Sequence, residues 1–275
     1  MRNHLLLALL SVMVFSCTMQ QTDWDKYAVT GKVKSIYLTT KFNGEVSEDE
    51  IESYNYNSLV EFDENGNITV DAIINDNGKI GCKHLYVYDD NNLLKKIENY
   101  LGDGCKLNCT DFSYDDNDKV VKEVSYPCLG DFLSIIQKEW DGDKLIKSKF
   151  EDKDFHGTLS AGYTIYEYDG DELVKTIEYD ASGKPTGEYS EYKNNKATKI
   201  VNPKYTSTFE YNDKGLCISS VNGRNGERNL SISIDGESYL YEYEYDEKGN
   251  WIKKIEKDMK SKKARYIYKR EIEYY

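Results

Sequence analysis

The stretch Tyr241-Glu-Tyr-Glu-Tyr-Asp-Glu-Lys-Gly-Asn-Trp-Ile-Lys253 contains the pattern that decides the fold. Its tyrosines alternate with glutamates, and alternation with a period of two predicts a strand with one buried face. The residues from Asp246 to Asn250 predict a tight turn, because Gly249 accepts a positive φ at little cost. The Trp-Ile-Lys that follows predicts the returning strand of a hairpin.

The same phrase recurs along the chain. An aromatic residue followed by an acidic one ends each outgoing strand, and between Asp63 and Asp169 the acids are spaced by 26, 26, 26 and 28 residues. Later copies, at Tyr192, Tyr211 and Tyr245, are less regular. A fixed period in this range indicates a repeat architecture. We expect about eight hairpin units, each with a first turn such as 63–67 and a second turn such as 181–183.

The returning strands share an apolar pair followed by lysine. Because alternate residues of a strand share a face, we expect the lysine to lie on the same face as the first apolar residue. Tyr166 and Tyr168 should then oppose Lys175 and Leu173. Lysine stems over tyrosine rings explain this pattern without a ligand. The lysines concerned are Lys95, Lys122, Lys147, Lys175 and Lys253.

Composition limits the partners. The chain of 275 residues carries a formal net charge of −13 and contains 25 tyrosines. Nucleic-acid binding needs a basic patch, so nucleic acid is excluded as a partner. Tyrosine favours strands and keeps a polar tip, which suits a sheet with much of its area near water.

The N-terminus predicts export. Met1-Arg-Asn-His and the apolar stretch from Leu5 to Phe15 are typical of a secretory signal peptide. The sequence Val14-Phe-Ser-Cys17 resembles a bacterial lipobox, which implies cleavage before Cys17 and lipidation of its thiol. A diacyl and an N-acyl chain together anchor a protein stably. An ordinary signal peptide is the alternative.

These features predict three segments. Residues 1–16 form the signal peptide, 17–26 the lipidated N-terminus and tether, and 27–275 a single repeat domain. The lipid would anchor the protein to the outer membrane of the cell envelope. No acidic run follows Cys17 directly, which favours the periplasmic side over the cell surface.

The phrase Tyr-Glu-Tyr-Asp-Glu-Lys-Gly-Asn over residues 243–250 resembles the YD repeat of Rhs-type proteins, Tyr-x-Tyr-Asp-x-x-Gly-Asn. It is also similar to the repeats of small exported lipoproteins of Bacteroidetes type. The resemblance covers roughly residues 55–275. Large Rhs proteins build closed shells from dozens of repeats, whereas about eight are present here. The resemblance implies no catalytic residues.

Fold class follows from the repeats. We expect an all-β protein whose antiparallel β-hairpin repeats form an elongated, twisted meander sheet or an open β-solenoid. Helix should be confined to the signal region and to residues 47–53.

No constellation of residues indicates catalysis, a cofactor or a metal, so we expect a protein that is not an enzyme. His84 and His156 are far apart in sequence. Asp152-x-Asp154-x-His156-Gly157 begins like an EF-hand loop, but Tyr163 stands where the loop needs glutamate. Asx turns explain the acidic turns.

Three functions are compatible with this sequence. The first is a non-catalytic envelope lipoprotein that acts as a binding or scaffold module for an unknown protein partner. The second is a glycan-binding module that uses tyrosine and tryptophan rings. The third, by analogy with other exported repeat proteins, is an immunity or antitoxin-type inhibitor.

Five cysteines remain after Cys17, and export would permit disulfides. If Tyr114 opposes Lys119 across the turn at 115–118, Cys105 and Cys128 lie directly opposite on adjacent strands. We therefore expect a Cys105–Cys128 disulfide and a reduced Cys217. Loss of register near Pro127 would leave all five as thiols.

Overall fold

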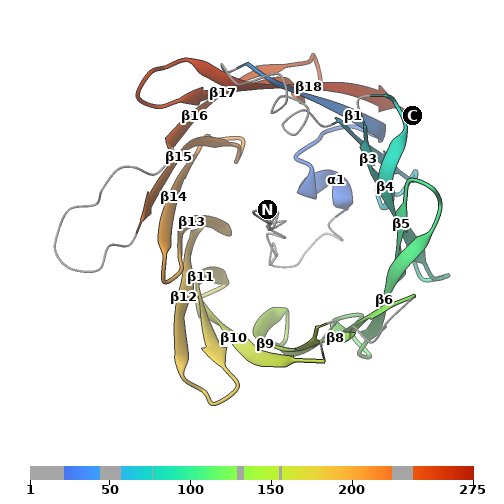
Figure 1. Cartoon of the computed structure of the whole chain (residues 1–275), viewed down its shortest axis with the longest axis vertical. Helices are drawn as coiled ribbons and strands as arrows, with labels where there is room; N and C mark the ends of the chain where they lie inside the picture. Colours follow the sequence, from blue (N-terminus) through green and yellow to red (C-terminus); the bar gives the residue numbers. More distant parts are fainter. Residues whose placement is uncertain (1–21, 44–56, 76, 129–132, 155–156, 225–237) are drawn as a thin grey trace.

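A computed structural model describes residues 22–43, 57–75, 77–128, 133–154, 157–224 and 238–275. These residues form 18 strands, each antiparallel to the next in the chain, and β18 pairs with β1 to close the sheet into a barrel (Figure 1). The strands are β1 Val33–Phe42, β2 Asn57–Phe62, β3 Ile68–Ile74, β4 Ile80–Tyr88, β5 Leu94–Leu101, β6 Lys106–Tyr114, β7 Val120–Pro127, β8 Leu133–Asp141, β9 Lys144–Lys153, β10 Leu159–Asp169, β11 Glu172–Asp180, β12 Pro185–Lys193, β13 Lys196–Val201, β14 Tyr205–Tyr211, β15 Cys217–Arg224, β16 Ser238–Tyr245, β17 Trp251–Asp258 and β18 Ala264–Tyr274.

Closure corrects the predicted architecture. The all-β, antiparallel hairpin prediction is confirmed, but the sheet is neither an open solenoid nor an elongated meander. The register from Ser35 opposite Glu273 to Phe42 opposite Tyr266 runs without interruption. An unpaired edge would expose a row of backbone donors and acceptors, and this pairing satisfies the edges of the first and last strands together.

Five of the eight first turns repeat one hydrogen-bonding pattern, and they begin at Asp63, Asp89, Asp115, Asn212 and Asp246. In the turn at 115–119, the Asp115 Oδ1 accepts the backbone N–H groups of Asn117 and Lys119, each at 2.9 Å. Asp246 accepts the equivalent N–H groups of Lys248 and Asn250 at 3.0 and 2.8 Å. The acidic residues are therefore occupied as Asx turns, as the sequence predicted.

A β-bulge follows the first turn in each of the eight hairpins and corrects the predicted lysine face. In the hairpin of β10 and β11, Tyr168 opposes Leu173 as predicted, but Glu167 opposes Lys175. One extra residue separates the two pairs, so the lysine turns to the opposite face from Leu173. The same shift pairs Glu139 with Lys147.

The bulges give the barrel a charged outer wall. Ion pairs join outward side chains around the wall: Lys96–Asp111, Lys149–Glu139, Lys199–Glu191, Lys253–Glu244, Lys257–Glu242 and Lys34–Glu273, at 2.5 to 3.5 Å. The inward positions between them carry most of the tyrosines, and Tyr86, Tyr166 and Tyr243 are examples.

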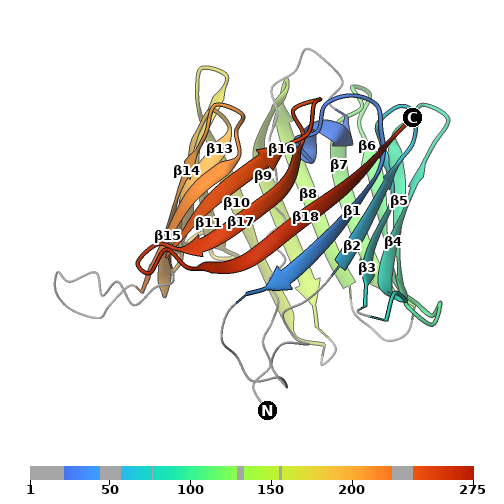
Figure 2. The ribbon, with the colours of Figure 1, turned by 90° about the horizontal axis from the view of Figure 1, so that it is seen from above.

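A four-residue helix lies inside the barrel, near its upper rim in Figure 2. This helix, α1 (Asp23–Lys26), was not predicted, and it falls outside the signal region. Its Trp24, with Tyr27, packs on a buried apolar cluster of the inner wall that contains Val60 and Phe62. The predicted helix at 47–53 lies outside the described residues. No helix in the described part has the length and apolar composition to cross a membrane.

Candidate functional site

Two rims and a lumen are the surfaces that the barrel offers to a partner. The first turns (63–67, 89–93, 115–119 and their equivalents) form one end, which we call the first-turn rim. The second turns (75–79, 102–105, 154–158, 181–184, 202–204 and 259–263) form the opposite end, the second-turn rim. The two rims differ in chemistry, and α1 is attached to only one of them.

Helix α1 is held at the first-turn rim by hydrogen bonds. The Asp23 N–H donates to the Gly66 carbonyl at 2.9 Å, and its carboxylate accepts the Ile68 N–H at 2.8 Å and the Tyr88 hydroxyl at 3.3 Å. The Trp24 indole N–H donates to the Val33 carbonyl at 2.8 Å. Burial and the charge of Asp23 raise the pKa of Tyr88 well above its usual value.

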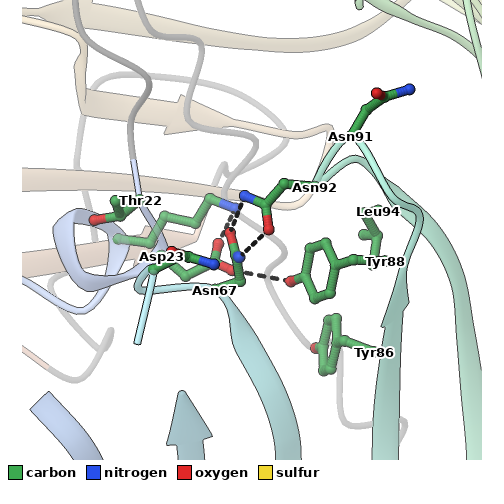
Figure 3. Close-up of a pocket in the computed structure, with 10 residues that line it drawn as sticks. Thr22, Asp23, Asn67, Tyr86, Tyr88, Asn91, Asn92 and Leu94 are labelled. Atoms are coloured by element: carbon green, nitrogen blue, oxygen red, sulfur yellow. Dashed lines mark hydrogen bonds and ion pairs between the residues drawn. The ribbon is translucent and has the colours of Figure 1, made fainter. Parts of the chain in front are cut away.

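A polar cavity of about 520 Å³ lies between α1 and the turns after β2 and β4 (Figure 3). Asn67 and Asn92 hydrogen-bond to each other at 2.8 Å across its floor. Tyr86 and Tyr88 line one side, and the start of α1 lines the other. The Asn67 and Asn92 amides and the Tyr88 hydroxyl are already hydrogen-bonded, and the described lining offers no evident catalytic group.

The inward aromatic rings form a structural ladder. Six of them lean across to the preceding strand and donate a hydrogen bond to its backbone, as Tyr114 does to the Leu94 carbonyl at 2.7 Å. The other members are Tyr88 to Ile68 at 2.9 Å, Trp140 to Val120 at 2.9 Å, Tyr168 to Leu145 at 3.1 Å, Tyr211 to Ala197 at 2.7 Å and Tyr243 to Cys217 at 2.7 Å.

Lysines cover several of these rings. The ammonium groups of Lys119, Lys144 and Lys196 lie 5.7 to 5.8 Å from the ring centres of the next aromatic residue of the ladder. The hydroxyl or indole N–H of the ring therefore binds the backbone, and the ring face binds a cation. This use of the rings weakens the glycan-binding alternative, which needs free faces.

Two cations are buried in the inner wall near α1. Lys254 Nζ lies 3.8 Å from the Tyr268 ring centre, and the Arg270 guanidinium lies 3.6 Å from that of Trp251. Burial lowers the pKa of Lys254, and it lowers the pKa of Arg270 to about 10. Aromatic faces replace the lost hydration. Strict alternation predicted Lys253 on the face of Trp251, but the bulge after the turn places Lys254 on that face instead.

Asp71 and His84 form an inward cross-strand pair on β3 and β4. Burial raises the pKa of Asp71, and the charge of His84 opposes that shift. Such a pair could transfer a proton, but no hydrogen bond connects it to a nucleophile among the described residues. Nor does any group of three or more histidine, cysteine or acidic side chains in the described ranges have the arrangement of a metal site.

The second-turn rim is the more apolar end. Its exposed apolar side chains are Ile73, Ile80, Leu101, Leu107, Leu159 and Tyr205, with exposed fractions between 40% and 75%. Val87, Ile146 and Ile252 are also exposed, but they lie on the outer wall beside the bulges of the other end. Tyr275, 51% exposed, also lies at that end, where its hydroxyl donates to the Phe62 carbonyl. The first turns themselves are mostly Asp, Asn, Gly, Glu and Lys, with Leu93 and Leu216 at the ends of two of them.

The predicted site residues have different outcomes. Cys17 lies outside the described residues, so its lipidation stays a prediction. The register assumed for the disulfide is wrong: a bulge makes Tyr114 oppose Val120, and Asn108 then opposes Pro127. Cys105 and Cys128 are therefore not directly opposite. All five described cysteines are thiols in this structure.

Comparison with known proteins adds little. No family model matches the chain, and no curated protein matches it. Among solved structures, a porin-like protein from Bacteroides uniformis is 12% identical, with 88% of this chain and 98% of that chain covered and a TM-score of 0.43. A porin-like protein from Bacteroides vulgatus is 11% identical, with 90% and 99% covered and a TM-score of 0.43.

A third similar structure is the complex TcdB2-TccC3-TEV, which is 12% identical, with 76% of this chain and 13% of that chain covered and a TM-score of 0.37. Likenesses this distant transfer no function to this chain. The argument below therefore rests on the chain's own surfaces.

Proposed function

We propose that this protein is a non-catalytic, lipid-anchored module of the cell envelope that binds a protein partner through its second-turn rim. The observation that carries the proposal is the concentration of exposed apolar side chains on that rim, at the end of the barrel opposite α1. Exposed apolar groups that gather on one surface are typical of interaction sites.

The charged outer wall supports a barrel that stands in water. A barrel embedded in lipid needs an outward apolar band about 25 Å tall. Here ion pairs such as Lys149–Glu139 and Lys257–Glu242 occupy outward positions along the strands, with side chains 26% to 58% exposed. Transferring such groups into hydrocarbon is costly at every one of these positions. A lipid on Cys17 would therefore supply the membrane attachment.

The length of the tether sets the orientation. Between Cys17 and α1 lie the five residues 18–22, which span at most about 18 Å when fully extended. A nine-residue strand such as β4 is about 30 Å long, and a tilt of about 40° makes the barrel roughly 23 Å tall. With α1 bound at the first-turn rim, the shorter path to the membrane leaves the barrel at that rim, and the lipid would lie there. The second-turn rim then points away from the membrane, toward a partner.

Site-specific photo-crosslinking in the native cell tests this function. A photoreactive residue at Leu159, 75% exposed on the second-turn rim, should give one discrete protein adduct. The same residue at Ile146, exposed on the wall near the first-turn rim, is the matched control and should not give that adduct. Ile80→Glu together with Leu101→Glu should abolish the adduct without changing the folded state.

Two results would overturn the proposal. One is an adduct of equal yield at position 146, which would indicate non-specific proximity. The other is specific retention on a glycan array that survives both rim substitutions, which would favour ligand binding in the lumen. A Cys17→Ser variant that stays acylated and membrane-bound would separately refute the anchor.

A further inference from the structure

Three thiols gather at the second-turn rim, where β6 begins and β7 ends. Cys105 precedes β6, Cys109 lies on β6 and Cys128 follows β7. In the ladder of these strands Cys109 opposes Tyr126. The Cys128 N–H donates to the Leu107 carbonyl at 2.9 Å, so the ladder continues as far as Cys128.

This register places two of the thiols on the same face. Cys128 is two residues from Tyr126 and shares its face, so it is diagonal to Cys109 on the outer wall. Diagonal Cα atoms in such a ladder are about 7–8 Å apart and the Cβ atoms closer. A disulfide needs Cα atoms within about 7 Å. The twist of the sheet therefore has to bring the two Cα atoms closer by only about 1 Å.

The surroundings of the two thiols are unequal. Cys109 is 3% exposed, whereas Cys128 is exposed to solvent. Desolvation by neighbouring side chains raises the pKa of Cys128, and the charge of the nearby Cys109 thiol acts in the same direction. Cys105 influences Cys128 more weakly than Cys109 does. The register and the mutual influence of the two thiols both place Cys128 near Cys109.

A lysine lies next to the pair. Lys106 Nζ binds the Glu98 carboxylate at 2.6 Å, and its pKa is raised by that hydrogen bond and by the neighbouring Cys109 thiol. An ammonium group beside a cysteine pair stabilises the sulfur anion through which thiol–disulfide exchange proceeds. The site thus combines an accessible thiol, a buried partner thiol and a cation.

We propose that Cys109 and Cys128 form a disulfide in the exported protein and that Cys105 stays reduced. Cys128 attacks the disulfide of an oxidised thiol–disulfide oxidoreductase and forms a mixed disulfide. Cys109 then attacks the Cys128 sulfur and releases the oxidoreductase as a dithiol. Two S–H bonds break and one S–S bond forms, while both electrons and both protons pass to the oxidoreductase.

The bridge joins β6 to β7 at the open end of their hairpin. Its closed loop contains the turn at 115–119, so the bond restricts the unfolded chain as well as the rim. The proposal requires oxidation but no partner protein bound at the rim, and it therefore stands or fails separately from the proposed function.

Peptide mapping of the full-length protein, alkylated and digested without reduction, tests the pairing. We expect one crosslinked peptide that contains Cys109 and Cys128, with loss of two of the five alkylatable thiols. Cys105→Ser is the matched control and should leave that peptide unchanged, whereas Cys128→Ser should abolish it. A crosslinked peptide with Cys105 and Cys128 would overturn the proposal.

A second measurement removes the dependence on export. The reduced, folded protein is equilibrated with glutathione disulfide, and the thiols are counted by mass after alkylation. Formation of the same crosslinked peptide supports the assignment. Full alkylation of Cys109 and Cys128 after this oxidation, in protein that remains folded, refutes it.

Discussion

Replacing Leu145 with alanine tests the bulge that reverses the lysine face. Leu145 is 2% exposed and opposes Trp140, while Ile146, the next residue, is the extra residue of the bulge and is 38% exposed. Strict alternation of faces would place Lys147 beside Leu145. The structure instead pairs Lys147 with Glu139 on the outer wall. Adjacent residues of similar size therefore have sharply different environments.

The expected energies follow from burial. Truncating a fully buried leucine to alanine costs about 2–5 kcal/mol through lost transfer energy and the cavity that remains. Ile146→Ala removes half-exposed atoms and should cost less than about 1 kcal/mol. For a chain of this size each kcal/mol lowers Tm by roughly 2–4 °C, so Leu145→Ala should lower it by about 5–15 °C.

Denaturant unfolding followed by circular dichroism measures both variants, and Lys147→Ala is the third member of the series. Lys147 lies half-buried on the outer wall, with its ammonium 4.3 Å from the centre of the Tyr163 ring. Its truncation should lower the free energy of unfolding by less than about 1 kcal/mol. Equal losses for Leu145→Ala and Ile146→Ala would refute the bulge. A large loss for Lys147→Ala would instead favour the uninterrupted alternation that the sequence suggests.

Three further predictions concern α1, the tyrosines and the anchor. Gly66→Ala places a Cβ 2.7 Å from the Trp24 ring, which should displace α1 and red-shift the tryptophan fluorescence. Gly104 has the same φ of +87° but open space around it, so Gly104→Ala is the control and should leave the spectrum unchanged. An unchanged spectrum would argue against the position of α1. Burial raises the pKa of Tyr86 and Tyr166 to about 12, so their contribution to stability is complete below pH 10 and is lost as the pH rises from about 10 through 12. The free energy of unfolding should fall over that range together with late phenolate absorbance, and a flat profile would contradict burial. Cys17→Ser should release the protein from the membrane fraction or leave it uncleaved.

The sequence by itself determined the local structure. The aromatic–acidic phrase and its spacing predicted the hairpins, and the aspartate that begins each turn predicted Asx turns such as those of Asp115 and Asp246, which the structure confirms. These features depend on residues within about ten positions of one another. Side-chain alternation and turn chemistry act over that distance, so they can be read directly from the chain.

Only the tertiary structure decided the bulges, the closure and the position of α1. A bulge adds one residue to a strand without any change in composition. Bulges turned Lys175 and Lys253 to the opposite face from the one predicted, and another changed which residue lies opposite Cys128. Closure depends on accumulated strand tilt and stagger, which no single hairpin contains. The pairing of β1 with β18 joins residues more than 220 positions apart. Twist and register add up around the whole sheet, and for that reason the sequence predicted each hairpin but not the ring that the hairpins form.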